Sequence, residues 1–181
     1  MNETKKLRVA LFFGGVSSEH EVSCVSASTW LRALAQATCA DRYEVFPVGI
    51  TKQGRWLACS PTPEAMADGS WEKGADCTPC VLSPDRTDHG IWLLKDGKAE
   101  LVHIDICAPV MHGKNGEDGT IQGLFELARI PYVGCGVLGS AVCMDKAVAN
   151  TIMDAAGVPH CKGQRHPRRA GGRPQDPAGQ H

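Results

Sequence analysis

The sequence predicts an α/β fold, with a mostly parallel sheet flanked by helices and with inserted β-hairpins. Three observations support this class. An apolar run ends at a glycine pair and is followed by helical spacing of apolar residues, which is the usual opening of a parallel sheet. Two later segments carry hairpin signals. The 181 residues are 43% hydrophobic and 22% charged, which is typical of globular domains and excludes a collagen-like, coiled-coil or wholly disordered chain.

The first unit is a strand over residues 7–13, closed by the turn Gly14-Gly15. A helix follows, because apolar residues return near every third or fourth position. Ser17 or Ser18 is expected to cap it, and the acidic residues after them suit the positive end of a helix. The positions that define its spacing are Val22, Val25, Thr29 and Leu34.

The next segments predict strands joined by short turns. Residues 43–50 form a strand, and residues 55–59 are expected to pair back on it. Residues 60–80 contain Pro, Gly and Asp and are expected to be a surface excursion. Residues 91–94 and 101–104 flank an Asp-Gly dipeptide, a strong hairpin signal.

The remaining elements return to the strand–loop–helix pattern. A buried strand over residues 104–111 ends at His112-Gly113, and a loop leads to a helix with apolar residues from Ile121 onward. A short strand is expected at residues 130–133. A final helix is expected from about 138 to 156, where Gly157 and Pro159 stop it. No internal repeat is evident.

Charge and cysteine content limit the classes of function. The net charge is −1, and the chain up to residue 162 is weakly acidic, so neither nucleic acid nor membrane is an expected partner. No apolar run is long enough to span a bilayer and no signal-peptide core follows the charged N-terminus, which predicts a cytoplasmic protein. Nine scattered cysteines are interpreted as reduced thiols. Cys77 and Cys80 leave a redox role open as a minor alternative.

Three glycine turns carry polar residues at the ends of predicted strands, at Gly14-Gly15, Gly113–Gly119 and Gly134–Gly136. In an open α/β sheet such loops meet helix N-termini and bind small charged ligands. A carboxylate such as Glu19 could hold an ammonium group, while backbone N–H groups hold a carboxylate. The alternatives are structural: the glycines only form turns, and Glu19 only favours a helix N-terminus. His112 could likewise be a strand-end histidine bonded to a backbone carbonyl, and Lys146 a solvated helix residue.

Several long motifs, in order and at plausible spacing, resemble the D-alanine–D-alanine ligase family of the ATP-grasp superfamily, which includes the D-alanyl-lactate and D-alanyl-serine ligases. The resemblance covers about residues 5–162. It implies that the sheet is Rossmann-like, of the pre-ATP-grasp type. The motifs are Phe12-Phe-Gly-Gly-Val-Ser-Ser-Glu-His-Glu-Val-Ser23, Met111-His-Gly-Lys-Asn-Gly-Glu-Asp-Gly-Thr-Ile-Gln-Gly-Leu124, Ile130-Pro-Tyr-Val-Gly-Cys-Gly-Val137 and Met144-Asp-Lys146.

The resemblance implies a two-step ligase for peptidoglycan synthesis, in which ATP phosphorylates one D-alanine and the amine of a second attacks the acylphosphate. Glu19 would hold the first ammonium group, with Val22 near the substrate side chain. His112 would lie beside the substrate carboxylates, so that Glu19 and His112 are the candidate catalytic residues. Lys146 would contact an ATP phosphate. The loop-shaping residues would be Gly14, Gly15, Gly113, Gly116 and Gly119.

The resemblance also implies three parts: an N-terminal ligase domain over 1–137, the start of a central ATP-grasp domain over 138–162, and a tail over 163–181. Full-length members use ATP and Mg²⁺ and form homodimers, and no metal ligands of this family are found in this chain. The expectation is therefore a fragment that is inactive alone. The alternative is a non-catalytic module that binds D-alanine or associates with a ligase. The second substrate stays open.

Residues 163–181 contain four arginines and no large apolar residue, so they are expected to be disordered. One interpretation is a basic tail that holds a partner. The favoured interpretation is out-of-frame sequence, because the composition changes abruptly where the resemblance ends.

Overall fold

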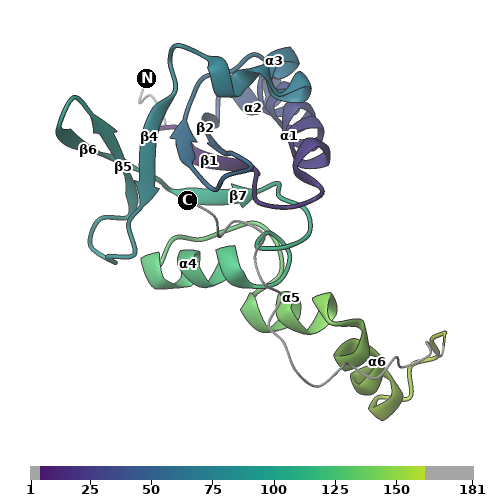
Figure 1. The fold of residues 1–181 in the computed structure, drawn as a ribbon. Coiled ribbons are helices and arrows are strands. Elements are labelled where there is room, and N and C mark those ends of the chain that lie inside the picture. The colour runs from purple at the N-terminus through teal and green to yellow at the C-terminus, as the bar shows by residue number, and fades with distance from the viewer. Residues whose placement is uncertain (1–4, 162–181) are drawn as a thin grey trace, which may run out of the picture. The chain divides into compact units, whose positions relative to one another are not determined.

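The computed structural model describes residues 5–161, and the chain forms two compact units that meet at the bond between Met144 and Asp145 (Figure 1). The first unit contains one seven-stranded sheet: β1 (Leu7–Gly14), β2 (Tyr43–Ile50), β3 (Trp56–Ala58), β4 (Thr78–Leu82), β5 (Gly90–Lys95), β6 (Lys98–His103) and β7 (Ile106–Pro109). Its helices are α1 (His20–Leu34), α2 (Ala37–Ala40), α3 (Pro63–Asp68), the 3-10 helix η1 (Ser70–Lys73), α4 (Thr120–Ala128) and α5 (Val137–Met144). The second unit contains α6 (Lys146–Ala155).

The strand order is β6-β5-β4-β3-β2-β1-β7. The α/β class is confirmed, but the expectation of a mostly parallel sheet is wrong in detail, because only β2-β1-β7 are parallel neighbours and β3 to β6 pair antiparallel. Connections as short as the turn between β5 and β6 can join only antiparallel strands. That hairpin is confirmed: Asp96 and Gly97 both have positive φ, 51° and 73°, as a type I′ turn requires.

Each face of the sheet buries its own hydrophobic core, and the helices lie on both faces (Figure 1). One core gathers side chains of α4, including Phe125, against Phe12 of β1. The other gathers α1, α3 and η1 against Leu11 and Phe13 of β1. Since β1 contributes to both cores, its run of apolar residues is continuous rather than alternating, as expected for a strand that is covered on both faces.

Helix α1 forms as predicted, but it buries a different face from the one its valines suggested. Val22 and Val25 are each 52% exposed, whereas the buried residues are small: Ser23, Cys24, Ala27 and Ser28, with His20 at the first position. Small side chains let the helix approach the sheet closely, so the buried stripe carries a weak hydrophobic signal. The predicted serine cap is also wrong, because the N-cap residue is Glu19.

Residues 60–80 are not a surface excursion, as they include α3, η1 and most of β4. Thr62 caps α3 by accepting a hydrogen bond from the N–H of Ala65, and Pro63 occupies the first turn. Met66 and Trp71 are buried, at 0% and 2% exposure. Trp71 stacks edge-on against Phe13 with ring centroids 4.8 Å apart. No other large apolar residue lies between 60 and 76, so no helical or strand periodicity predicts the burial of these two side chains.

Two other expectations are corrected after β7. The short strand at residues 130–133 is reduced to a single parallel bridge between Cys107 and Tyr132. The single helix expected from 138 to 156 is two helices, α5 and α6, separated at Asp145. The Asp145 side chain accepts hydrogen bonds from the N–H groups of Ala147 and Val148, and therefore caps a new helix.

The boundary predicted between 137 and 138 stays a prediction, and the tail over 163–181 lies outside the described residues. Within the second unit, Val148 and Ile152 of α6 are 44% and 49% exposed. Across residues 5–161, none of the helices has the length and apolar character needed to cross a membrane.

Candidate functional site

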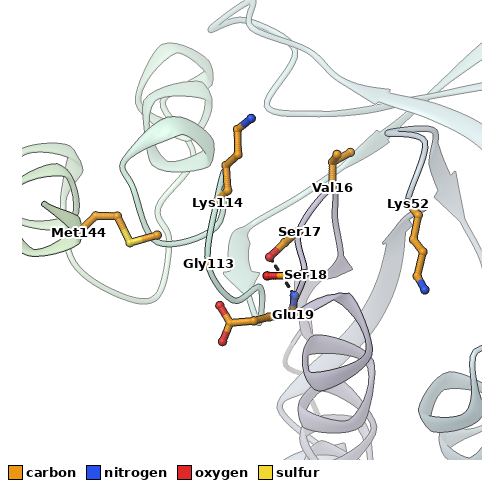
Figure 2. A pocket seen from close by; sticks show the side chains of 8 residues that line it. All are labelled: Val16, Ser17, Ser18, Glu19, Lys52, Gly113, Lys114 and Met144. Atoms are coloured by element: carbon orange, nitrogen blue, oxygen red, sulfur yellow. Dashed lines mark hydrogen bonds between the residues drawn. The ribbon is translucent and has the colours of Figure 1, made fainter. Parts of the chain in front are cut away.

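Two loops of the first unit meet at a pocket of about 550 Å³ (Figure 2). One loop joins β1 to α1, and the other follows β7 and leads into α4. Both start at the carboxyl ends of parallel strands, where open α/β sheets bind ligands. The lining residues are Val16, Ser17, Ser18, Glu19, Lys52, Gly113, Lys114 and Met144.

Glu19 carries the negative charge of this pocket. It is the N-cap residue of α1, and its backbone N–H donates to the hydroxyl of Ser17 at 3.1 Å. Figure 2 shows its side chain extending toward the loop at Gly113. The side chain is exposed, so its carboxylate can meet a ligand from solvent.

Gly113 lies directly against that carboxylate. A Cβ at this position would be 2.5 Å from Oε2 of Glu19 and 2.8 Å from Oγ of Ser17, and the residue has a φ of +70°. The positive φ favours glycine here, and a Cβ would displace the ends of the Glu19 and Ser17 side chains. The N–H of Gly113 donates to Oε2 of Glu117 at 2.7 Å, so the second loop is held in place by its own acidic residue.

Two buried side chains of α1 fix the first loop. His20 donates from Nδ1 to the carbonyl of Gly15 at 2.9 Å, and its Nε2 lies 3.7 Å from Oε1 of Glu72. Ser23 accepts from the N–H of Gly14 at 2.8 Å and donates to the carbonyl of Val110. Ser23 therefore ties the end of β1 to the end of β7, which places both loops of the pocket relative to each other.

Asp118 organises the second loop. Its carboxylate accepts from the N–H of Asn115 at 2.9 Å and from that of Thr120 at 3.0 Å. Burial acts to raise the pKa of Asp118, but these backbone hydrogen bonds outweigh it and hold the pKa below its ordinary value. Gln122 donates to the carbonyl of Gly116 at 2.8 Å, so the loop is tied to the first turns of α4.

His112 precedes Gly113 but does not line the pocket that contains Glu19. It is half-buried, and its Nε2 shares a 3.1 Å hydrogen bond with the hydroxyl of Ser26 on α1 rather than with a backbone carbonyl. It lines a neighbouring pocket of about 550 Å³ together with Gly116 and Glu117. The two candidate catalytic residues thus lie in different pockets: both loops line the pocket of Glu19, whereas the pocket of His112 is lined by the second loop and not by the loop between β1 and α1.

The remaining predicted site residues have different placements. Val22 lies exposed on α1, one turn after Glu19, and is not among the residues that line either pocket. Lys146 is the exposed first residue of α6 in the second unit.

The other candidate loop-shaping glycines are closely packed. A Cβ would be 2.3 Å from the Ile50 carbonyl at Gly14, 3.0 Å from Met111 at Gly15, 2.6 Å from Met111 at Gly116 and 2.9 Å from the Val137 carbonyl at Gly119.

Sequence reasoning missed His20, Ser23 and Ser26 as parts of the site. All three lie in or beside the motif that contains Glu19, and the spacing of three residues between His20, Ser23 and Ser26 places them along one side of a helix. That spacing was the available signal. Lys52, which comes from the loop after β2, was also missed; it forms an ion pair with Glu21 at the edge of the pocket.

The described residues do not gather a cluster of possible metal ligands. Residues 5–161 contain no group of three or more His, Cys, Asp or Glu side chains that could hold a metal ion. Mg²⁺ prefers carboxylate oxygens, and each of the two pockets is lined by one carboxylate residue, Glu19 in the first and Glu117 in the second.

The fold and the paired loops define a class: an α/β domain in which a carboxylate and glycine-rich backbone line a pocket at the strand ends. A family model described as "D-ala D-ala ligase N-terminus" matches residues 8–135. The chain therefore belongs to the D-alanine–D-alanine ligase family, and its matched residues are the N-terminal part of that family.

Individual relatives agree with this assignment. The chain is 49% identical over 154 residues to a D-alanine–D-alanine ligase of Caldicellulosiruptor bescii, covering 85% of this chain and 40% of that protein. It is 45% identical over 154 residues to the vancomycin B-type resistance protein VanB of Enterococcus faecalis, covering 84% and 42%. Both relatives are much longer, and the chain spans about two fifths of their length.

Solved structures show the same fold. The VanG D-Ala:D-Ser ligase of Enterococcus faecalis superposes with a TM-score of 0.76 at 38% identity, covering 84% of this chain and 43% of that one. The D-alanine–D-alanine ligase of Coxiella burnetii gives a TM-score of 0.73 at 32% identity, covering 86% and 43%.

Proposed function

We propose that this chain is the N-terminal part of an ATP-dependent D-alanine–D-alanine ligase of peptidoglycan synthesis, and that its Glu19 pocket holds the first D-alanine. The observation that carries the proposal is the exposed carboxylate of Glu19, set against the backbone of Gly113 where two strand-end loops meet. Family membership and the ligase names of the relatives support the choice of substrate.

The charges of the pocket suit a zwitterion. Glu19 supplies the negative partner for an ammonium group, and Lys114 adds a positive charge at the same pocket. Lys52 contributes less, because it is already paired with Glu21. His112 is held by a hydrogen bond to Ser26 and lines the adjacent pocket. We propose that from there it lies near the carboxylate of the substrate. Val22 remains a proposed neighbour of the substrate side chain.

We further propose that residues 5–161 do not catalyse phosphoryl transfer by themselves. Such catalysis depends on cations placed around the transferring phosphate, and the described residues lack a cluster able to hold Mg²⁺. Lys146 is the one residue assigned to an ATP phosphate. Assembly as a homodimer and a location in the cytoplasm are proposals that rest on family membership alone.

An NMR titration of the ¹⁵N-labelled chain with D-alanine tests the binding proposal. The amides of residues 17–19 and of Gly113 should shift on addition of millimolar D-alanine. Glu19→Gln should weaken the response about tenfold or more, a loss of about 1.4 kcal/mol in binding free energy. Glu100→Gln, an exposed change on β6, is the matched control and should bind as the unaltered chain does.

Shifts confined to other surfaces, or an unchanged affinity in Glu19→Gln, would contradict the proposed site. A separate assay follows ADP release from ATP in the presence of D-alanine and Mg²⁺. The chain alone should release no D-alanine-dependent ADP, and such release would overturn the proposal that these residues are inactive alone.

A further inference from the structure

Two cysteines lie opposite each other at the ends of β3 and β4. The register of this antiparallel pair sets Leu57 opposite Pro79 and Ala58 opposite Thr78. One further step sets Cys59 opposite Cys77. The strands stay close beyond this point, because the N–H of Ser60 donates to the side chain of Asp76 at 2.7 Å.

The backbone hydrogen bonds show which kind of cross-strand pair this is. The N–H of Cys59 donates to the carbonyl of Pro47 on β2, and that of Cys77 donates to the carbonyl of Gly74. Neither N–H is used between β3 and β4, so Cys59 and Cys77 form a non-hydrogen-bonded pair. Cα atoms in such pairs are about 4.5 Å apart, which falls at the short end of the range that disulfides bridge.

The two side chains lie on the same face of the sheet. Cys59 is buried in the core formed with α1, α3 and η1, and Cys77 packs against that core as a partly buried residue. The charge of a Cys77 thiolate acts on the Cys59 thiol, and both residues are free cysteines. Cys80 belongs to the core on the opposite face, which is why the Cys77–Cys80 pair considered from the sequence is wrong.

We propose that Cys59 and Cys77 form a redox-active dithiol that closes to a cross-strand disulfide by exchange with a small-molecule disulfide such as glutathione disulfide. The bond would close the loop that contains α3 and η1. It would restrain the segment that contains Trp71, and it would remove the 3.1 Å hydrogen bond that the thiol of Cys77 donates to the Trp71 carbonyl, because a disulfide sulfur has no proton to donate.

The chemistry balances in two exchange steps. The thiolate of Cys77, the more exposed sulfur, attacks glutathione disulfide, forms a mixed disulfide and releases one glutathione. The thiolate of Cys59 then attacks the Cys77 sulfur of that mixed disulfide and releases the second glutathione. The two protein thiols lose two protons and two electrons, and the electrons reduce one glutathione disulfide to two glutathione molecules.

The local environment makes the reaction slow at neutral pH. Burial raises the pKa of both thiols, and the charge of Asp76 raises the pKa of each further, with Glu72 adding to the effect at Cys77. Because the thiolate is the reactive form, the rate should increase steadily between pH 7 and pH 9. The dithiol should respond to sustained oxidation rather than to brief exposure.

Tryptic peptide mapping tests the proposal directly. The reduced chain is incubated at pH 8.5 with excess glutathione disulfide, its remaining thiols are alkylated, and the digest is analysed without reduction. Trypsin cuts after Arg55, Lys73 and Arg86, so the expected product is peptide 56–73 linked to peptide 74–86. Cys80→Ser, which leaves Cys77 as the one cysteine of peptide 74–86, should give the same linkage in the same yield.

The single variants identify the order of attack. In Cys59→Ser, glutathione should accumulate on Cys77, because the second sulfur that would displace it is missing. In Cys77→Ser, glutathione should attach to Cys59 more slowly than it attaches to Cys77 in Cys59→Ser. Absence of the 56–73 to 74–86 linkage in the folded chain, its loss in Cys80→Ser, or its formation only after unfolding in urea would each overturn the proposal. Cys135, exposed on the surface, serves as the internal control that the oxidant was active.

Discussion

The carboxylate of Glu19 rests against the backbone of Gly113, so closely that a Cβ at residue 113 would be 2.5 Å from Oε2. Glu19 ends the loop after β1, and Gly113 lies in the loop after β7. β1 and β7 are parallel neighbours, so this contact joins the ends of two adjacent strands. The position of the proposed ammonium-binding group therefore depends on a glycine 94 residues further along the chain.

Replacing Gly113 by alanine should displace Glu19 and destabilise the chain by about 2 kcal/mol, because the residue combines a φ of +70° with the close contact. Urea unfolding followed by fluorescence measures the effect. Gly123→Ala is the matched control. It lies inside α4 with open space around the added Cβ, and it should stabilise the chain by about 0.5–1 kcal/mol. Equal effects from the two substitutions would contradict the importance of the Glu19 contact.

Ser23→Ala should cost about 2 kcal/mol of unfolding free energy, because it leaves the N–H of Gly14 and the carbonyl of Val110 without their buried partner. Thr29→Ala changes an exposed hydroxyl on the same helix and should stay within about 0.5 kcal/mol of the unaltered chain. A Ser23→Ala chain as stable as the Thr29→Ala chain would show that Ser23 does not hold the two strand ends together.

Asp118 predicts a defined pH dependence. Since its folded pKa is lowered, the hydrogen bonds to Asn115 and Thr120 stabilise the fold above the unfolded pKa of about 3.9, and this stabilisation is lost as the pH falls through the lowered folded value. Melting temperatures measured from pH 6 to pH 3 should fall less steeply in Asp118→Asn than in the unaltered chain. Parallel curves for the two chains would mean that Asp118 does not contribute to acid sensitivity.

The sequence predicted those parts of the fold that have strong local signals. The apolar run of β1 and the Asp96-Gly97 turn specify their structures within a few residues. The helical break at Asp145 was missed because apolar residues continue on both sides, and only the capping hydrogen bonds of the aspartate separate α5 from α6. Trp71 was placed at the surface, although its ring fills the space above Gly49, where a Cβ would be 2.2 Å away.

The contacts within the candidate site could not be predicted from the sequence. Glu19 and Gly113 were both selected from motifs, yet their mutual contact depends on the pairing of β1 with β7, which no local pattern encodes. The separation of His112 into a neighbouring pocket follows from its hydrogen bond to Ser26 on α1. Both are tertiary relationships between distant segments, so spacing along the chain could not reveal them.

A comparison of D-alanine with D-lactate is the most direct test of whether Glu19 recognises an ammonium group. The two molecules share a carboxylate and a methyl group, but D-lactate has a hydroxyl in place of the ammonium. In parallel NMR titrations of the unaltered chain, D-alanine should shift the amides of Glu19 and Gly113, and D-lactate should bind at least about tenfold more weakly. Equal shifts at equal concentrations would contradict the proposed role of Glu19, because recognition would then not depend on the charge that faces its carboxylate.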